Sequence, residues 1–183
     1  GITRENDTAW AFFDKLGFSA YRDEQFIADV DFLKIDPPEE KVLRELSVRE
    51  IVPTYEKWLL KALQAGDAAL EVVIWEEHRR MALKTTARHW TIREDEEEVG
   101  YLRISGLTSE MTAYIVCSEA YWGSDRQWAW IREALDTYPF PPNTLFVEAA
   151  STAQFRESAD MYAKIGFRTD KKGRFLLFKQ LDR

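Results

Sequence analysis

Residues 153–167 read AQFRESADMYAKIGF, and residues 5–18 read ENDTAWAFFDKLGF. Each stretch predicts an amphipathic helix that ends at a glycine, Gly17 or Gly166, because a glycine just past the last turn readily takes a left-handed conformation. Each helix is followed by a phenylalanine and an extended segment. The two phenylalanines, Phe18 and Phe167, are 149 residues apart, which is about one domain length. The chain therefore carries a repeat, with one copy near each end.

After the first copy, the spacing of apolar residues predicts a mixture of strands and helices. Ser47 and Glu50 form a capping box at the start of one helix, and Pro53 is expected to separate its first turn from the rest. The prolines and acidic residues of 36–40 predict a boundary. The expected strands are 26–35, 41–46, 89–94, 99–107, 112–120, 143–150 and 173–181, the last beginning at 167–169; the expected helices are 47–66, 67–87, 125–138 and 155–165. This order predicts an α/β (α+β) fold with a mixed, mostly antiparallel central sheet flanked by helices.

Composition limits the function classes. The net charge is -7, and an acidic chain repels phosphate backbones, so no nucleic-acid partner is expected. No apolar run approaches ~18 residues, so no membrane-spanning helix is expected. The single cysteine, Cys117, excludes an internal disulfide and fits a reducing compartment such as the cytoplasm. The acidic run 95–98 predicts a solvated turn, and His78 and His89 lack partners in ligand spacing, so no metal site is expected.

The repeated stretch resembles the C-terminal motif of the GNAT acyltransferases, N-x-x-A-x-x-[F/Y]-[Y/F]-x-K-[L/I]-G-F. In the second copy, Phe155 and Ser158 stand where the motif has asparagine and alanine. The matching residues are Asn6, Ala9, Phe13, Lys15, Gly17 and Phe18 in the first copy, and Tyr162, Lys164, Gly166 and Phe167 in the second. The resemblance implies a complete GNAT-like domain over 40–183, with 1–38 as the tail of a preceding GNAT unit in a tandem protein. Alternatively, 1–38 is an extension that packs on the sheet of the second unit.

The resemblance also implies a chemistry, because 112–128 falls where the family's fourth strand runs into its CoA pyrophosphate loop. Acetyl-CoA or a similar acyl-CoA would be the co-substrate, and the acyl group would pass by direct attack to a primary amine of a small molecule or peptide. Tyr162 would protonate the leaving thiolate, and Glu119 or Glu148 would take the proton of the amine. The residues expected at the cofactor are Val116, Cys117, Gly123, Ser124, Arg126 and Gln127. A homodimer or a partner GNAT unit is the expected assembly.

Departures from the family's loop leave other interpretations open. Trp122 stands where a polar or basic residue is expected, and Asp125 where a glycine is expected, and a carboxylate repels a pyrophosphate. Ser124 or Asp125 would then simply cap the next helix, and Tyr162 would be a packing residue. The domain would be catalytically degenerate, with a structural, dimerisation or ligand-binding role, or a sensor unrelated to CoA. The sequence does not determine the acceptor amine, the acyl length or the oligomeric state.

Overall fold

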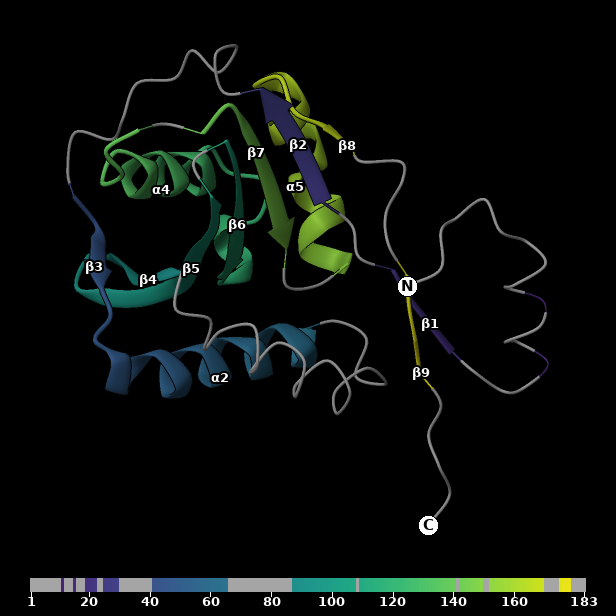
Figure 1. The fold of residues 1–183 in the computed structure, drawn as a ribbon. Coiled ribbons are helices and arrows are strands. Elements are labelled where there is room, and N and C mark those ends of the chain that lie inside the picture. The colour runs from purple at the N-terminus through teal and green to yellow at the C-terminus, as the bar shows by residue number, and fades with distance from the viewer. Residues whose placement is uncertain are drawn as a thin grey trace.

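Figure 1 shows the fold in a computed structural model. The structure describes residues 19–22, 25–29, 41–65, 87–107, 109–140, 142–149, 152–169 and 175–178, together with Ala11 and Lys15. Both isolated residues are helical. The rest of the helix predicted in the first repeat copy, and the helix predicted at 67–87 up to residue 86, lie outside the described residues.

A seven-stranded sheet forms the centre of the described fold, in the order β3-β4-β5-β6-β7-β2-β8 (Figure 1). Its strands are β2 (Gln25–Asp29), β3 (Leu43–Glu45), β4 (Arg88–Glu94), β5 (Glu97–Leu107), β6 (Glu110–Cys117), β7 (Thr144–Ala149) and β8 (Arg168–Thr169). Neighbouring strands run antiparallel, except that β6 and β7 run parallel. The predicted α/β fold with a mixed, mostly antiparallel sheet is therefore confirmed.

Helices cover both faces of this sheet. They are α2 (Val48–Ala65), α4 (Arg126–Leu135), α5 (Thr152–Lys164) and the short 3-10 helix η3 (Glu119–Tyr121). Side chains of α4 and α5 join the larger hydrophobic core on one face. Helix α2 covers the other face (Figure 1). Its Tyr55 and Trp58 pack against Tyr101 and Tyr114 of the sheet. Strand alternation sorts the sheet residues between the two cores.

The capping box at the start of α2 forms as predicted. The backbone N–H and the hydroxyl of Ser47 donate to Oε2 of Glu50 at 3.0 and 2.7 Å. These bonds lower the pKa of the Glu50 carboxyl to about 2. The predicted separation at Pro53 is wrong, because α2 is continuous from Val48 to Ala65. Proline's fixed φ is compatible with a helix, and the packing of α2 on the sheet offsets the one backbone hydrogen bond that Pro53 removes.

The acidic run after β4 makes a shorter turn than predicted. Asp95 and Glu96 alone connect β4 to β5, and both have positive φ, 47° and 70°, as in a two-residue type I′ hairpin. Glu98 lies within β5, where its carboxylate accepts hydrogen bonds from Trp58 Nε1 at 2.7 Å and Lys57 Nζ at 3.0 Å. The prediction of a solvated turn over 95–98 is wrong for the second half of the run, because α2 supplies partners for Glu98.

The end of α5 shows what the KIGF motif does. Gly166 has φ 103°, and its N–H donates to the Ala163 carbonyl at 3.1 Å. The N–H of Phe167 donates to the Tyr162 carbonyl at 2.9 Å, which completes a Schellman cap. The reversal returns the Phe167 ring to the core, edge-on to the Tyr162 ring at 5.2 Å. The predicted glycine stop is confirmed.

The N-terminal segment contributes to the seven-stranded sheet. Strand β2 lies between β7 and β8, with Ile27 opposite Phe146 on one side and Arg168 on the other. A separate two-stranded antiparallel sheet joins β1 (Ser19–Arg22) to β9 (Phe175–Phe178) (Figure 1). The prediction that 167–169 begins one final strand with 173–181 is wrong, because β8 and β9 are separate strands that belong to different sheets. Residues 40–183 alone do not supply every strand of the larger sheet.

The pairings of β1 and β8 obey one rule. Ser19 and Arg168 each follow the phenylalanine of their repeat copy. Ser19 lies opposite Phe178 of β9, and Arg168 lies opposite Ile27 of β2. The equivalent of Ile27 in the second copy is Leu176, so the two registers differ by two residues. The first strand after each repeat copy is thus paired with the second strand after the other copy.

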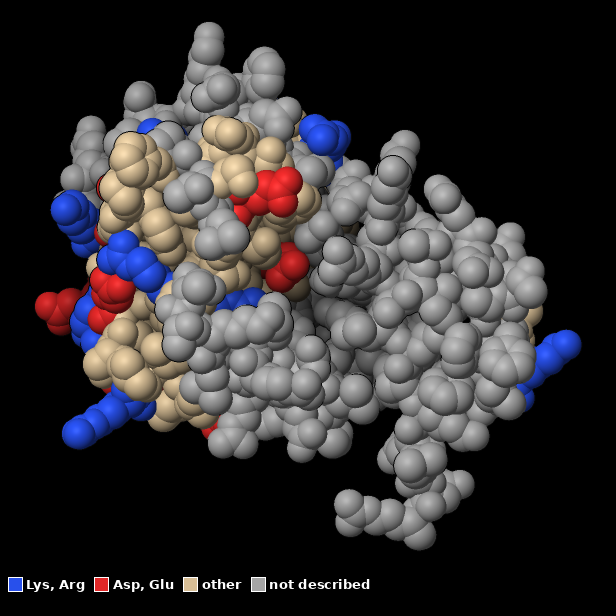
Figure 2. Space-filling model, viewed as in Figure 1, with Lys and Arg blue, Asp and Glu red and all other residues tan. Residues whose placement is uncertain are grey.

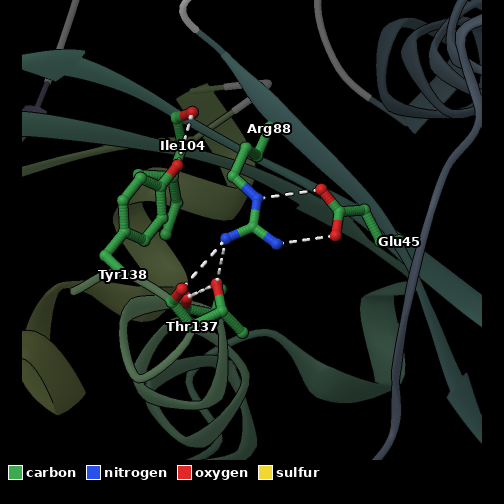
Figure 3. Close-up of polar contacts among 6 residues, drawn as sticks. Glu45, Arg88, Ile104, Thr137 and Tyr138 are labelled. Atoms are coloured by element: carbon green, nitrogen blue, oxygen red, sulfur yellow. Dashed lines mark hydrogen bonds and ion pairs between the residues drawn. The ribbon is translucent and has the colours of Figure 1, made fainter.

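Arg88 ties the β3 edge of the sheet to the end of α4 (Figure 3). Its Nε and Nη2 donate to the two carboxylate oxygens of Glu45 at 2.8 and 2.6 Å. Its Nη1 donates to the carbonyl and hydroxyl oxygens of Thr137 at 3.1 and 2.7 Å. The guanidinium also lies 5.3 Å from the ring centroid of Tyr138, whose hydroxyl donates to the Ile104 carbonyl at 3.3 Å. The hydrogen bond from Arg88 lowers the pKa of Glu45.

The described surface mixes charges of both signs. On the face in Figure 2, the Lys and Arg side chains lie interspersed with those of Asp and Glu. None of the described helices is long and apolar enough to cross a membrane.

Candidate functional site

The parallel strands β6 and β7 part at one end of their pairing. The pairing ends at Ile115 and Ala149, whereas β6 continues to Cys117 alongside β5. After Ala149 the chain leads into α5. We call this place the β6–β7 fork, defined by Ile115, Val116 and Cys117 on one side and Ala149 on the other.

At the fork, the N–H and C=O groups of successive β6 residues point alternately toward β5 and toward β7. The N–H of Ser118 donates to the Val99 carbonyl at 2.9 Å, so Ser118 faces β5. Alternation along the ladder then directs the backbone groups of Val116 toward β5 and those of Ile115 and Cys117 toward the fork. The fork therefore presents a short edge of β6 that is no longer paired with β7.

Two side chains satisfy the carbonyls on this edge. Gln154 of α5 donates from Nε2 to the Ile115 carbonyl at 3.3 Å. The indole Nε1 of Trp122, in the loop after β6, donates to the Cys117 carbonyl at 3.1 Å. Groups from the helix and the loop thus take the positions that a further strand would otherwise occupy.

The loop between β6 and α4 packs closely on α5. Gly123 has φ 71°, and a Cβ at this position would lie 2.6 Å from the carbonyl oxygen of Glu157. The Gly123 N–H donates to Ser158 Oγ at 3.3 Å. The N–H groups of Trp122 and Ser124 donate to carbonyls within their own loop and η3. Gly123 is thus required by the close approach of α5.

No protein-family model and no curated relative matches the sequence. Solved structures do match its fold. One is a functionally unknown conserved protein from Staphylococcus epidermidis, with a TM-score of 0.59 and 16% identity, covering 96% of this chain and 68% of that one. A second is a GCN5-related N-acetyltransferase from Kribbella flavida, with a TM-score of 0.53 and 8% identity, covering 92% of this chain and 62% of that one.

A third is a tandem GNAT protein from the clavulanic acid biosynthesis pathway, with a TM-score of 0.54 and 16% identity. That match covers 97% of this chain and 60% of the other. The chain has the GNAT fold. Identities this low establish the fold alone, and the chain spans between 60% and 68% of the length of these three proteins.

The residues predicted at the cofactor lie in β6, the following loop and the first turn of α4, and of these Val116 and Cys117 belong to the fork of this GNAT fold. Gln127 is fully buried and donates from Nε2 to the Tyr121 carbonyl at 2.9 Å and to Ser158 Oγ at 3.0 Å. The predicted capping of α4 is wrong. The Ser124 hydroxyl donates to the Tyr121 carbonyl at 2.9 Å, and Asp125 makes no side-chain cap. Asp125 already has helical backbone angles, which do not suit the usual capping geometry.

The Arg126 guanidinium is already paired with a carboxylate. It forms an ion pair with Oε2 of Glu94, and the other oxygen of Glu94 accepts from Trp130 Nε1 at 2.8 Å. The Glu94 side chain is 8% exposed, so this carboxylate depends on its two donors. A phosphate group would have to compete with Glu94 for Arg126.

Tyr162, the predicted acid, lies on α5 and is 1% exposed. Burial, with a smaller effect of Cys117, raises the pKa of its phenol well above the usual value of 10. Burial likewise raises the pKa of the Cys117 thiol to about 12. Both groups therefore hold their protons at neutral pH, so Tyr162 carries a proton and Cys117 is a poor nucleophile.

The two predicted bases lie in different settings. Glu119 opens η3 and is exposed. Glu148 is half-buried on β7, one residue before that strand ends, and it lies opposite Tyr114 of β6. Glu148 therefore borders the fork from the face that α2 covers. Val116, predicted near the thioester carbonyl, directs its amide toward β5, and the amide that faces the fork is that of Cys117.

Sequence reasoning missed the polar residues that line this region. Gln154 and Ser158 are fully buried, and with Tyr162 they recur every fourth residue along α5. This spacing puts three polar groups on an otherwise apolar face of the helix, and it is the sequence pattern that could have identified them as candidate site residues. Arg103 was also missed, although alternation in β5 places it on the same covered face as Tyr101. Among the described residues, no three His, Cys, Asp or Glu side chains come together as metal ligands.

Proposed function

We propose that this chain is an N-acyltransferase unit that moves an acetyl or similar acyl group from acyl-CoA to a primary amine. The observation that carries the proposal is the β6–β7 fork, which is bordered by Glu148 and backed by α5. An extended, amide-containing arm such as that of CoA can bind a free strand edge as another strand would. The fork offers such an edge once Gln154 and Trp122 leave its carbonyls. Helix α4 begins beside it without a side-chain cap, which favours a nearby anion.

Four residues at or near the fork have defined tasks in this proposal. Glu148 accepts the proton of the amine, directly or through a water, as the amine nitrogen bonds to the acyl carbon. As the carbon–sulfur bond breaks, Tyr162 gives its phenolic proton to the departing thiolate. The Cys117 amide donates to the carbonyl oxygen of the thioester. Glu119 is the alternative base, on the exposed side of the loop.

Binding requires two side chains to leave the fork. The Gln154 and Trp122 hydrogen bonds, at 3.3 and 3.1 Å, occupy carbonyls that the incoming arm would use. Each neutral bond contributes about 1 kcal/mol net, which the new bonds at the same carbonyls offset. Asp125, exposed at the start of α4, opposes a phosphate at the helix end.

Calorimetric titration of acetyl-CoA into the wild-type chain and Gln154→Ala tests the proposal. We expect micromolar binding to the wild type and roughly fivefold tighter binding to the variant, because about 1 kcal/mol of competing interaction is removed. Tyr162→Phe should bind acetyl-CoA normally but turn over an amine roughly a hundredfold more slowly. Absence of binding to both the wild type and Gln154→Ala at millimolar acetyl-CoA would contradict the proposal.

A second candidate function is a GNAT-fold domain without catalysis. It is favoured by the closed polar contacts among Gly123, Gln127 and Ser158, and by the pairing of Arg126 with Glu94. This candidate predicts that Gln154→Ala combined with Trp122→Phe, which frees both fork carbonyls, still fails to bind acetyl-CoA. Binding by that double variant, together with acetyl transfer to an amine by the wild type, would exclude the non-catalytic interpretation.

We also propose that residues 1–38 are the tail of a preceding GNAT unit and that the assembly is a pair of GNAT units joined by exchanged strands. The exchange of partners, β1 with β9 and β8 with β2, supports this organisation. In the larger sheet β2 is paired on both edges, so the corresponding strand β9 is expected to pair on its second edge with a strand of the preceding unit. Placing a GNAT unit before residue 1 should protect β9 amides from hydrogen exchange, and unchanged protection would contradict the proposal.

A further inference from the structure

A row of polar side chains crosses the sheet beside the fork, on the face that α2 covers. Its members are His89 on β4, Arg103 on β5, Tyr114 on β6 and Glu148 on β7, each opposite the next in the strand registers. Side chains directly opposite one another share a face of the sheet. Tyr114 and Glu148 immediately precede the last residue pair before the fork. The row therefore runs up to the place where the acyl group would be transferred.

Arg103 is a buried cation that lacks an anionic partner among the described residues. It is 3% exposed, and its Nε and Nη1 are buried and make no hydrogen bond. Its guanidinium carbon lies 5.0 Å from the ring centroid of Tyr114. A cation–π contact of this kind offsets only part of the cost of removing an arginine from water. Buried arginines are normally paired with oxygen acceptors.

Arg103 is the only positively charged residue in the row, because the imidazole of its neighbour His89 is neutral. His89 is 3% exposed, and its Nδ1 lies 2.7 Å from the hydroxyl of Tyr101. Burial, together with the charge of Arg103, lowers the pKa of His89 to about 4. The imidazole is therefore neutral at pH 7. Glu148 supplies the negative charge, two strands away from Arg103 and about 10 Å across the sheet.

We propose that Arg103 binds an anionic oxygen group, a carboxylate or a phosphate ester, on the acceptor amine. Guanidinium N–H groups suit such oxygens, and the two unsatisfied nitrogens supply the donors. Glu148 attracts the ammonium end of the same molecule before it takes the proton of the amine. The acceptors are thus small amines that also carry an acid, and identifying them as acceptors rests on the proposed acyltransfer.

The ligand class is tested without acyl-CoA, by thermal melting and intrinsic tryptophan fluorescence with matched amines. The pairs are lysine with cadaverine, phenylalanine with phenethylamine, and O-phosphoethanolamine with ethanolamine. In each of the first two pairs the members differ by a carboxylate, and in the third by a phosphate. We expect the acid-bearing member of at least one pair to bind roughly tenfold more tightly. The pair that responds distinguishes a carboxylate from a phosphate, and equal binding within every pair would overturn the inference.

Variants locate the response. Arg103→Met should abolish the preference for the acid-bearing amine, and Arg103→Lys, which keeps the charge, should retain part of it. Arg93→Met is the matched control, because Arg93 is exposed on β4 and donates to the Glu96 carbonyl at 2.7 Å. That control should leave the preference unchanged.

Stability separates a ligand-binding role of Arg103 from a structural one. Arg103→Met should melt at the same temperature as the wild type or higher, because it removes a buried charge that the fold does not compensate. A clearly lower melting temperature, or failure of Arg103→Met to fold, would mean that the chain itself supplies the partner, and would overturn the inference.

The inference and the proposed acyltransfer can fail separately. Binding of acetyl-CoA at the fork with no preference for acid-bearing amines would reject the role of Arg103 alone. A preference that depends on Arg103, without any binding of acetyl-CoA, would keep the anion site and reject the acyltransfer.

Discussion

Replacing Gly123 with alanine is expected to destabilise the domain through two separable effects. An L-residue at φ 71° lies in the left-handed region, which costs roughly 1–2 kcal/mol. The new Cβ would also lie 2.6 Å from the carbonyl oxygen of Glu157, so the loop must move away from α5. That movement stretches the bond from the Gly123 N–H to Ser158 Oγ, now 3.3 Å, for a further loss of about 1 kcal/mol.

The total is about 2–3 kcal/mol of unfolding free energy, which corresponds to roughly 5–10 °C in melting temperature for a domain of this size. Urea unfolding followed by tryptophan fluorescence measures it. Ser158→Ala removes the hydrogen bond alone and should cost about 1 kcal/mol. Gly123→Asn tolerates the left-handed angle but keeps the Cβ, so it should fall between Ser158→Ala and Gly123→Ala. An unfolding free energy of Gly123→Ala within about 0.5 kcal/mol of the wild-type value would refute the reasoning, because substitutions with so small an effect are typical of exposed positions that make no close contact.

Three further predictions concern the sheet and its charges. Arg88→Met should lower the unfolding free energy by about 1 kcal/mol, measured by urea unfolding. Adding Glu45→Gln should cost little more, because both substitutions remove the same half-exposed contact. Additive losses would show that the two residues act independently. Ile27→Pro should cost about 3 kcal/mol or more, because the backbone N–H groups of a strand paired on both edges donate hydrogen bonds to its neighbours. Ile27→Val keeps the N–H and should cost less than about 1 kcal/mol. Equal stability of the two variants would exclude β2 from the sheet. The pKa of His89 falls from 6.5 to about 4 on folding, so the unfolded chain binds the proton first as the pH is lowered. The unfolding free energy of the wild type should therefore fall by up to about 3 kcal/mol between pH 6.5 and pH 4. If the unfolding free energy of His89→Gln depends on pH as steeply as that of the wild type, this prediction is wrong.

The elements that depend on local periodicity were predictable from the sequence. Trp128, Ile131 and Leu135 fall on one helical face in the sequence, and all three are buried in α4. The capping box and the glycine at the end of α5 depend on contacts within a few residues, so their residue types were sufficient evidence. The antiparallel meander of β4, β5 and β6 likewise follows from three alternating segments joined by short connections.

The pairing of the terminal strands was not predictable in the same way. Alternation along 25–29 or 175–178 indicates a strand, but it does not choose between two neighbours with similar edges. Because the two repeat copies carry equivalent strands, β8 can in principle pair with β9 or with β2. The structure pairs it with β2, which is more than a hundred residues away in the sequence.

At the candidate site, the motif located the positions but not their contacts. Gly123 was found from its place after β6, whereas the reason for it, the carbonyl of Glu157, comes from a different helix. Arg126 was predicted to contact an anion and does so, but its partner is Glu94, 32 residues earlier. The contact between Arg126 and Glu94 depends on how α4 packs against the end of β4, and the local sequence pattern does not predict that packing.

The most direct test of the β6–β7 fork is a nuclear magnetic resonance titration of acetyl-CoA that follows the indole N–H signals. The Trp122 signal, assigned with Trp122→Phe, reports the bond to the Cys117 carbonyl, and the Trp130 signal reports a bond to Glu94 away from that edge. If the fork receives the acyl-CoA arm, the Trp122 signal moves in proportion to saturation while the Trp130 signal shifts little. A Trp122 signal that stays in place up to millimolar acetyl-CoA would contradict the account.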